Sequence, residues 1–310
     1  MKKIFVDGSV GTTGLRIFER LSGRDDVELI TIDEEHRKDF ESRKAAIESA
    51  DAAFLCLPDD AAREIAAAVD TSRVKLLDTS TAHRTNPDWA YGFPELSSDF
   101  REKIKTSQKI AVPGCHASGV IAILYPLIQS GIMPKDYPVT IHSITGYSGG
   151  GKKMIAEYND ENRHSEFSSP RQYGLTQNHK HLKEITEICS LSMNPIFSPI
   201  VADFYSGMVV TVPLFSHLLK GKPTVADLHQ IFSEHYKNQK MVNVMPMGKD
   251  GMLGSNNLSG NDRLEIEITG NDDRIIIASR FDNLGKGSSG AAIQCMNIAL
   301  GFEETKGLDI

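Results

Sequence analysis

The sequence predicts an α/β protein in which a parallel sheet flanked by helices is followed by an α+β domain with a mixed or antiparallel sheet. Three observations lead to this prediction. Apolar strands alternate with helices through the first third of the chain, a glycine-rich turn follows the first strand, and period-2 strands with a hairpin signal occupy the second half. The length, 310 residues, is sufficient for two domains.

The first third contains a regular alternation of short strands and helices. Apolar runs typical of strands lie at residues 3–6, 27–32, 52–57, 74–77 and 110–112, and helical patterns lie at residues 15–21 and 61–69. Strands that are apolar throughout and separated by helices are typical of a parallel sheet covered on both faces. This part therefore resembles a doubly wound domain.

The second part has a different pattern. After a helical stretch at residues 118–130, we expect strands at residues 139–144, 196–201, 208–214, 241–245, 264–269 and 274–279. Residues 270–273, Gly-Asn-Asp-Asp, are a hairpin signal between the last two. The polar segment 158–176 is expected to be a long surface excursion, and residues 287–301 form a final helix suited to packing against the first domain.

Composition narrows the class of protein. Hydrophobic residues make up 40% and charged residues 24%, as in an ordinary globular protein, and no apolar run reaches the ~18 residues of a membrane span. The net charge of −7 gives no reason to expect nucleic acid or a membrane as partner, so an anionic substrate needs a locally basic pocket. The four cysteines are scattered without a CxxC pair, which predicts cytoplasmic residence with free thiols and no metal site.

A glycine-rich turn follows the first strand and opens a helix. This is the context of a Rossmann-type dinucleotide-binding site, where the backbone approaches a pyrophosphate and the helix N-terminus stabilises its charge. The spacing differs from GxGxxG, so a flexible turn is the competing interpretation. The expected cofactor contacts are Gly8, Ser9, Gly11, Thr12, Thr13 and Gly14.

The residues after the second strand leave the choice between NAD and NADP open. Asp33 stands where an acidic residue usually holds the ribose hydroxyls of NAD. His36, Arg37 and Lys38 follow at once and offer positive charge for a 2′-phosphate. A solvated charged loop is the alternative for each of them taken alone.

Cys115 lies in the most specific chemical motif of the sequence. Pro113 and Gly114 follow a strand and should turn the chain so that Cys115 opens the next helix. A thiolate at a helix N-terminus is stabilised by the helix dipole, which is what a nucleophilic cysteine needs at neutral pH. Burial as a small apolar residue is the usual fate of a free cysteine, and we assign it to Cys56, Cys189 and Cys295.

A nucleophilic thiol needs an acid/base partner. The densest histidine cluster contains His179 and His181, just before a helical run, with a polar helix start as the alternative interpretation. His116 adjoins the thiol, but we expect its side chain to point elsewhere on the helix.

Two further loops are candidates for ligand binding. Residues 146–152 follow a strand and are rich in glycine, so Ser148, Gly149 and Lys152 are candidates for contacts with a phosphate or a nicotinamide. Asn283, before the last helix, has a carboxamide suited to the nicotinamide amide. Ordinary loops are the alternative in both places.

Taken together, these stretches resemble the N-acetyl-gamma-glutamyl-phosphate reductases, and more closely their shorter (type 2) form. The resemblance extends over nearly the whole chain. It rests on GSVGTTG at 8–14, LDTSTAHR at 77–84, YGFPEL at 91–96, PGCHASG at 113–119, GYSGGGK at 146–152, NHKHLKEI at 178–185 and DNLGKGSSGAAIQCMNIALG at 282–301.

The resemblance implies an oxidoreductase of arginine biosynthesis that uses NADPH to reduce N-acetyl-L-glutamyl 5-phosphate to the 5-semialdehyde. It implies a dinucleotide-binding domain of residues 1–114 and 285–310 around a catalytic and dimerisation domain of residues 115–284. Cys115 would be the nucleophile and a histidine of residues 178–181 the acid/base. We also expect a homo-oligomer, dimer or tetramer, and no partner other than the small-molecule substrate.

The substrate contacts depend on less specific likenesses. Arg84 is the candidate for the phosphate, because a related semialdehyde dehydrogenase family has an arginine in a similar motif; a surface arginine is the alternative. His116 stands where the family usually has tyrosine, and Lys152 where its glycine loop usually ends in arginine. These departures concern substrate contacts and leave the thiol chemistry unaffected.

Two other functions fit the same motifs. One is a relative that acts on aspartyl phosphate or a carrier-bound aminoadipyl phosphate. The other is a non-catalytic dinucleotide-sensing regulator, which would bind the cofactor without thiol reactivity at Cys115.

Overall fold

The computed structural model describes residues 1–248 and 251–310 and divides into two compact units. The first unit consists of Met1–Gly114 and Ser288–Leu308, and the second of Cys115–Gly287 with Asp309–Ile310. The chain therefore passes from one unit to the other three times, first between Gly114 and Cys115. None of the helices within the described residues has the length and apolarity needed to cross a bilayer.

The first unit is built on a six-stranded sheet in which every neighbouring pair of strands is parallel. The order of its strands is β2-β1-β3-β4-β6-β5. This confirms the predicted parallel sheet. The strands are β1 (Lys2–Asp7), β2 (Val27–Ile30), β3 (Ala52–Leu55), β4 (Lys75–Asp78), β5 (Ala90–Tyr91) and β6 (Lys109–Ala111).

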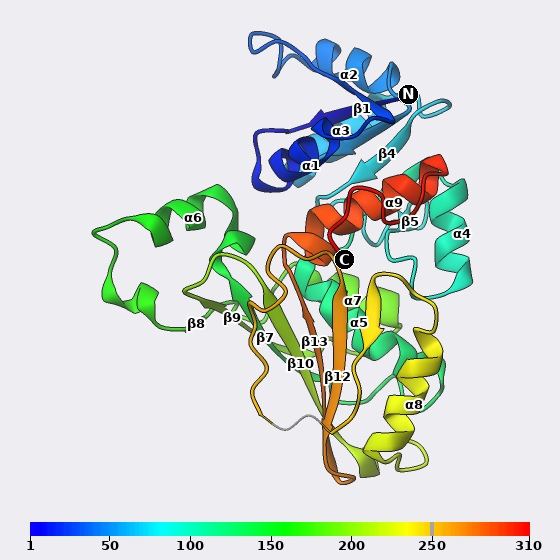
Figure 1. Cartoon of the computed structure of the whole chain (residues 1–310), viewed down its shortest axis with the longest axis vertical. Helices are drawn as coiled ribbons and strands as arrows, with labels where there is room; N and C mark the ends of the chain where they lie inside the picture. Colours follow the sequence, from blue (N-terminus) through cyan, green and yellow to red (C-terminus); the bar gives the residue numbers. More distant parts are fainter. Residues whose placement is uncertain (249–250) are drawn as a thin grey trace. The chain divides into compact units, whose positions relative to one another are not determined.

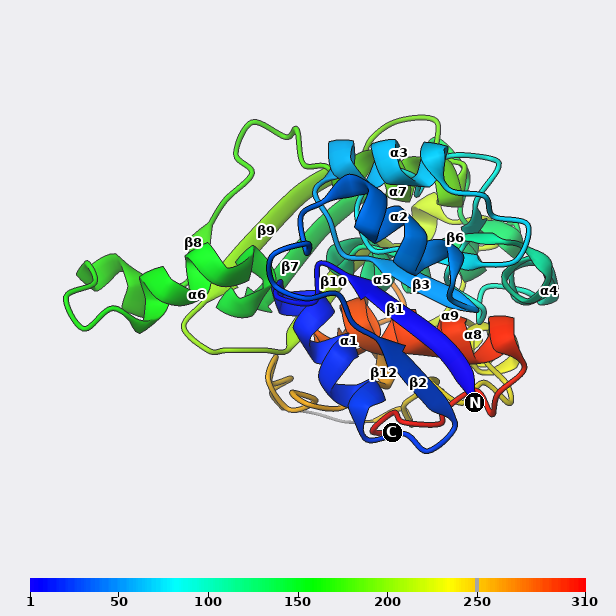
Figure 2. The ribbon, with the colours of Figure 1, turned by 90° about the horizontal axis from the view of Figure 1, so that it is seen from above.

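Helices cover both faces of this sheet, as Figure 2 shows. One face packs against α1 (Thr12–Ser22), α4 (Ser98–Thr106) and α9 (Gly290–Leu300). The other packs against α2 (Phe40–Glu48) and α3 (Asp59–Ala68). The two apolar clusters share the strands, whose residues point alternately to one face and the other: Ile4 belongs to the first cluster and Phe5 to the second.

The direction in which successive strands are added to the sheet reverses between β1 and β3. The chain moves from β1 to its neighbour β2 on one side, then crosses to β3 on the other. In an open α/β sheet the carboxyl ends of two such strands flank the crevice in which ligands bind. The turn that begins at Gly8, directly after β1, lies at this point.

The second unit is built on a seven-stranded mixed sheet of order β11-β12-β13-β10-β7-β9-β8, as predicted. Two pairs, β11 with β12 and β7 with β9, are parallel, and the others are antiparallel. The predicted hairpin joins β12 to β13. The strands are β7 (Thr140–Gly146), β8 (Arg171–Gln172), β9 (Ile196–Ala202), β10 (Met208–Phe215), β11 (Val242–Val244), β12 (Leu264–Gly270) and β13 (Arg274–Phe281).

The helix α5 (Cys115–Gln129) lies directly on this sheet. It packs on β10 and β13, with α7 (His181–Cys189) and α8 (Val225–His235) beside it. Gly119 permits the close approach, because a Cβ there would lie 2.6 Å from the side chain of Val210 and 2.7 Å from that of Ser279. Ser279 also donates a hydrogen bond to the Gly119 carbonyl, at 3.0 Å. The position of Cys115, at the start of α5, is thereby fixed relative to the sheet.

The expected surface excursion contains structure of its own. It begins with the short helix η1 (Tyr147–Gly150) and α6 (Gly151–Asn159), and η2 (Ser165–Ser168) precedes β8. Figure 1 shows the α6 segment extending away from the rest of the second unit. Its last part returns, since β8 pairs with β9. The sequence patterns did not predict this return.

Candidate active site

Cys115 is the first residue of α5, as the Pro-Gly turn predicts. Its side chain is partly buried, whereas Cys189 and Cys295 are fully buried. Burial raises the pKa of Cys56 to about 12, and also raises that of Cys189, so both stay protonated thiols at neutral pH. The helix N-terminus gives Cys115 an environment that the other three cysteines lack.

Both candidate histidines lie beside the second residue of α5. The ring of His116 is centred 5.5 Å from that of His179 and 5.7 Å from that of His181. The rings of His179 and His181 are 4.7 Å apart. The side chain of His116 turns from the start of α5 toward the residues that lead into α7.

The way the chain enters α7 explains why both histidines gather here. The helix begins at His181, so His179 is outside it, and the two side chains do not diverge as they would on a continuous helix. The backbone N–H of His181 donates to Nδ1 of His179 at 3.2 Å, which fixes the bend. His181 is buried and His179 is half-buried. His179 is therefore the more accessible of the two.

Burial keeps His116 and His179 uncharged at neutral pH. It lowers the pKa of His116 to about 3, with the positive charges of His179 and Lys180 as smaller causes. It lowers the pKa of His179 to about 4, with Lys180 again contributing. At neutral pH both rings are neutral, so His179 is available as a proton acceptor. Glu184, one turn along α7 from His181, is a buried carboxylate.

Tyr173 completes the cluster and was not found from the sequence. Its hydroxyl lies 2.7 Å from Nε2 of His116, and its backbone N–H donates to the Pro199 carbonyl at 3.0 Å. Burial raises the pKa of Tyr173, and the negative charge of the Cys115 thiolate raises it further. The phenol therefore stays protonated at neutral pH. Tyr173 directly follows β8, in the segment taken from the sequence for a surface excursion.

The glycine turn of the first unit has the geometry of a phosphate-binding turn. Gly8 has φ +85°, and a Cβ on it would lie 2.3 Å from the carbonyl oxygen of Cys56. A Cβ on Gly14 would lie 2.3 Å from the carbonyl oxygen of Gly8. Gly11 caps α1 and donates to the Gly8 carbonyl at 2.9 Å. Only glycine fits at Gly8 and Gly14, and α1 starts directly beyond the turn.

The remaining residues of this turn are accessible. Ser9, Thr12 and Thr13 are all partly exposed, and the Thr13 hydroxyl lies 3.0 Å from that of Ser288. Beneath them, the Arg43 guanidinium pairs with Asp7 at the end of β1, at 2.8 Å. The ion pair thus fixes the end of β1, from which the turn starts, while the hydroxyls of Ser9, Thr12 and Thr13 remain accessible to a ligand.

The loop after β2 contains the residues that we expect to decide whether the chain binds NAD or NADP. Asp33 is exposed, and both the backbone N–H and the ring of His36 bond to its carboxylate, at 3.0 and 2.6 Å. These bonds lower the pKa of Asp33. Arg37 pairs with Glu34 at 3.0 Å. Both bonds from His36 go to the same carboxylate oxygen, Oδ1, and the Asp33 side chain remains exposed.

Arg84 is buried and bonds to the backbone of its own unit. Its Nε donates to the Val112 carbonyl at 2.9 Å, and one terminal nitrogen donates to the Thr79 carbonyl at 2.9 Å. It is not the surface arginine of the alternative interpretation. These bonds support the chain just before Cys115, so Arg84 has a structural role whatever it binds.

The two other predicted loops meet each other in the second unit. Asn283 is buried; its carboxamide donates to the Ser148 hydroxyl at 2.9 Å and accepts from the Gly207 N–H at 2.8 Å. Gly149 adjoins this contact, since a Cβ on it would lie 3.6 Å from Nδ2 of Asn283. Lys152, in the first turn of α6, is exposed. Asn283 thus holds the glycine loop in place.

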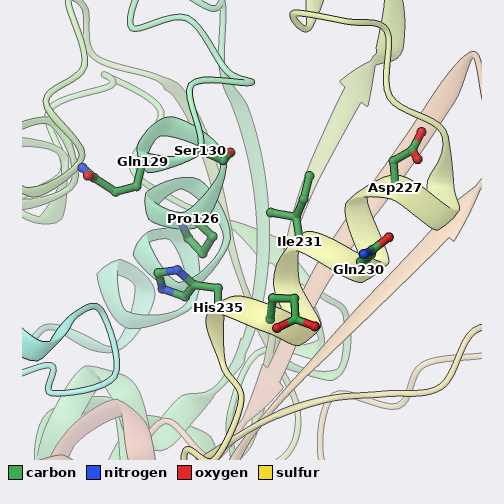
Figure 3. A pocket seen from close by; sticks show the side chains of 8 residues that line it. Pro126, Gln129, Ser130, Asp227, Gln230, Ile231 and His235 are labelled. Atoms are coloured by element: carbon green, nitrogen blue, oxygen red, sulfur yellow. The ribbon is translucent and has the colours of Figure 1, made fainter.

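A surface groove lies elsewhere in the second unit, between the end of α5 and α8 (Figure 3). Pro126 and Ser130 line it from one side and Asp227, Ile231 and His235 from the other. It contains none of the residues predicted to bind substrate or cofactor.

Comparisons with known proteins agree on one family. The model described as semialdehyde dehydrogenase, NAD binding domain matches residues 3–107, and the one described as semialdehyde dehydrogenase, dimerisation domain matches residues 115–283. The chain is 43% identical to N-acetyl-gamma-glutamyl-phosphate reductase 2 of Nostoc sp. over 318 residues, covering 99% of each chain. It is also 43% identical to the N-acetyl-gamma-glutamyl-phosphate reductase of Brucella ovis over 307 residues, covering 96% of this chain and 99% of the other.

Solved structures show the same fold at low sequence identity. The aspartate semialdehyde dehydrogenase II of Vibrio cholerae complexed with ASA superposes with a TM-score of 0.72 at 14% identity, covering 97% of this chain and 98% of the other. The aspartate semialdehyde dehydrogenase of Francisella tularensis gives a TM-score of 0.72 at 14% identity, covering 96% and 99%.

Proposed function

We propose that this chain, which belongs to the N-acetyl-gamma-glutamyl-phosphate reductase family of semialdehyde dehydrogenases, reduces N-acetyl-L-glutamyl 5-phosphate to N-acetyl-L-glutamate 5-semialdehyde. NADPH is the reductant and phosphate the second product, in a step of arginine biosynthesis. One observation carries the proposal: the helix N-terminus at Cys115 adjoins a cluster of rings that contains His179 and His181.

In the first half of the reaction, the Cys115 thiolate attacks the γ-carbonyl carbon of the acyl phosphate. The carbon–oxygen bond to phosphate breaks, phosphate leaves with the electron pair, and a thioester remains on the sulfur. The N-terminus of α5 stabilises both the thiolate and the oxyanion of the tetrahedral intermediate, because its first backbone amides have no partner within the helix. The thiol proton passes to a neutral histidine.

In the second half, the nicotinamide supplies a hydride to the thioester carbon. The resulting thiohemiacetal oxyanion takes a proton from the histidine. The same histidine then removes the hydroxyl proton as the carbon–sulfur bond breaks, which frees the aldehyde and the thiolate. We assign this role to His179, because it is the more accessible of the two candidates, and leave His181 to orient the substrate.

The turn after β1 is the proposed cofactor site. Its glycines at 8 and 14 leave no space for a side chain, so a pyrophosphate can approach the backbone, while Ser9, Thr12 and Thr13 offer hydroxyls. Arg37 is the proposed contact for the 2′-phosphate of NADP. Ser148, Gly149 and Asn283 are proposed for the nicotinamide end. The family membership of the chain supports NADP over NAD.

The substrate carries a phosphate and a carboxylate, whereas the chain as a whole is acidic. Arg84 and Lys152 are the proposed cationic contacts. For Arg84, the two hydrogen bonds to carbonyls hold the guanidinium in one orientation, which would position it for an anion. Lys152 is exposed at the start of α6 and would reach the substrate as a flexible charge.

We also propose a homo-oligomer that forms through the face of the seven-stranded sheet opposite α5 and α8. The helices α5 and α8 pack on one face, and Ile276 and Phe215 on the opposite face are 43% and 52% exposed. Ile144 and Val209, paired across β7 and β10, line the same surface as Ile276. Multi-angle light scattering on Ile276→Asp should show a smaller particle than the wild type; an unchanged mass would exclude this face.

All four cysteines are free thiols. A reactive free cysteine persists in a reducing compartment, which supports the proposal that the enzyme acts in the cytoplasm.

The decisive assay runs the reaction in reverse. Purified protein is incubated with N-acetyl-L-glutamate 5-semialdehyde, NADP and inorganic phosphate, and NADPH is followed by absorbance. We expect phosphate-dependent NADPH formation that Cys115→Ser abolishes. Aspartate semialdehyde and aminoadipate semialdehyde serve as alternative substrates, and a higher kcat/KM with either would replace the proposed substrate. Cofactor binding without turnover on any of them would indicate a sensing regulator instead.

A further inference from the structure

We propose that Gln177 is a positioning residue for His179, because its side-chain amide fixes the loop that leads to His179 against β9. The inference rests on the proposed function in taking His179 as the acid/base residue. The loop, residues 174–180, connects the end of the β8 segment to α7. Gln177 lies two positions before His179 in this loop, and its amide contacts the backbone of Phe197.

The Gln177 amide makes two hydrogen bonds to Phe197, a residue of β9. Its Nε2 donates to the Phe197 carbonyl at 2.8 Å, and its Oε1 accepts from the Phe197 N–H at 2.9 Å. A side-chain amide that donates and accepts in this way makes the same pair of bonds as a residue of an adjacent antiparallel strand. The two bonds together fix both the distance and the orientation of the Gln177 side chain relative to β9.

These bonds continue the pairing of β8 with β9. Directly after β8, the Tyr173 N–H donates to the Pro199 carbonyl at 3.0 Å, and Phe197 is the next residue but one on β9. Backbone groups of alternate residues in a strand point to the same side. The main chain turns away at Gly174, whose carbonyl accepts from the Gln177 N–H at 3.0 Å. The side chain of Gln177 therefore takes the place beside β9 that the backbone of the β8 segment has left.

The backbone of Gln177 has an unfavourable conformation. Its φ is +58°, in the left-handed region that residues with a Cβ rarely occupy. Such a conformation persists only where the surrounding contacts hold it. For this exposed residue, the two bonds to Phe197 are such contacts. Removal of the amide should therefore release the loop.

Phe197 connects this contact to the histidines. Its side chain is buried, and its ring lies edge-on to the His179 ring at 5.0 Å and to the His116 ring at 5.2 Å. Gln177 thus binds the backbone of the residue whose ring packs against His179. This packing contributes to the partial burial of His179, and burial is the main reason why the pKa of His179 is about 4.

The titratable groups that face His179 are unchanged when the amide is removed. His116 on α5, with its ring centred 5.5 Å away, is neutral at neutral pH, and Tyr173 after β8, at 6.1 Å, stays protonated. Next to His179 along the chain are the buried His181, at 4.7 Å, and the exposed Lys180, whose charge also lowers the pKa of His179. A higher pKa of His179 without the amide therefore reports greater contact with water.

The test compares Gln177→Ala and Gln177→Gly with the wild type and with Gln172→Ala, an exposed glutamine of β8 that serves as the matched control. Diethyl pyrocarbonate reacts with neutral imidazole, and its rate at His179 is followed by peptide mass spectrometry between pH 7 and pH 5, with the reagent concentration measured at each pH. The wild type should give a nearly level profile, because a pKa of about 4 leaves the ring neutral throughout.

Both Gln177 variants should lose the level profile, because the pKa of His179 rises toward 6.5 as the ring gains water. A pKa that reaches about 6 gives an about tenfold fall in rate from pH 7 to pH 5. Gln172→Ala should keep the wild-type profile. In turnover, kcat of both Gln177 variants should fall about 10- to 100-fold with little change in KM, since the acid/base group is displaced while the substrate contacts remain.

A level profile in Gln177→Ala would overturn the proposal. So would a wild-type profile in Gln177→Gly beside a changed one in Gln177→Ala, because the backbone conformation and not the amide would then position His179. An equal change in Gln172→Ala would show a general effect of substitution near β8 and would overturn it as well. The reaction with diethyl pyrocarbonate needs no substrate, so it judges Gln177 even if His179→Asn retains turnover and the acid/base assignment fails.

Discussion

Replacing His116 by glutamine should remove a specific part of the acid sensitivity of this protein. In the folded chain the pKa of His116 is about 3, against 6.5 in an unfolded chain. Above pH 6.5 the ring is neutral in both states and contributes no pH dependence. Below it the unfolded chain gains a proton that the folded chain cannot accept, so stability falls by about 1.4 kcal/mol per pH unit until the pH approaches 3. From pH 7 to pH 5 the loss from this residue is about 2 kcal/mol.

The assay compares urea denaturation midpoints and slopes for the wild type and His116→Gln at pH 7, 6 and 5. The variant has a different free energy of unfolding at pH 7, since a buried side chain has changed. That difference cancels when the loss between pH 7 and pH 5 is calculated separately for each protein. The wild type should lose about 2 kcal/mol more than the variant between pH 7 and pH 5. Parallel losses in the two proteins would show that His116 takes up its proton in the folded state and would refute the argument from burial.

Other substitutions test the site and the fold. Cys115→Ser should abolish turnover and leave cofactor affinity nearly intact in fluorescence titrations, whereas Cys295→Ser should be almost silent; a comparable loss at 295 would mean that the nucleophile is misassigned. If His179 is the base, kcat/KM falls as the pH drops through about 4, since the ring must be neutral to accept a proton. His179→Asn should lose this acidic fall of the pH–rate profile and most of the rate. If His181→Asn loses them and His179→Asn keeps them, the roles of the two histidines are exchanged. Steady-state kcat/KM should favour NADPH over NADH, and equal values would contradict the cofactor assignment. Gly119→Ala should cost about 1–3 kcal/mol in thermal or urea denaturation, because its Cβ would enter the side chains of β10 and β13; full stability would show that α5 can move.

The features that the sequence predicted well are those encoded within a few neighbouring residues. The parallel sheet follows from short apolar runs between helical patterns, and the turn at Gly8 follows from its place between a strand and a helix. The start of α5 at Cys115 follows from the Pro-Gly pair before it. In each case the residues that cause the structural feature lie within a few sequence positions of it, so the local pattern is enough to predict it.

The features that were missed depend on contacts between distant positions. Tyr173 meets His116 across 57 positions and Ser143 meets it across 27. No local pattern connects them, since pairing of β8 with β9 is what brings Tyr173 back from the excursion. The contacts of the His116 side chain could not be predicted for the same reason: its helix position is local, but the partners that select its rotamer are not. The fixed orientation of Asn283 between Ser148 and Gly207 likewise needed the three-dimensional structure.

The chain passes from one unit to the other at Cys115, which determines where the protein can be cut into fragments or recombined with relatives. A fragment that begins at the second unit would start with Cys115, the proposed nucleophile, and an ammonium group would replace the peptide bond from Gly114. That group would add a full positive charge beside the sulfur and would substitute for the single amide at the head of α5. If Cys115 is the nucleophile, as proposed, its thiol has the proper chemistry only in a continuous chain. Recombination between related enzymes should preserve function when the exchanged segment includes residues on both sides of this junction, and fail when a crossover falls on it.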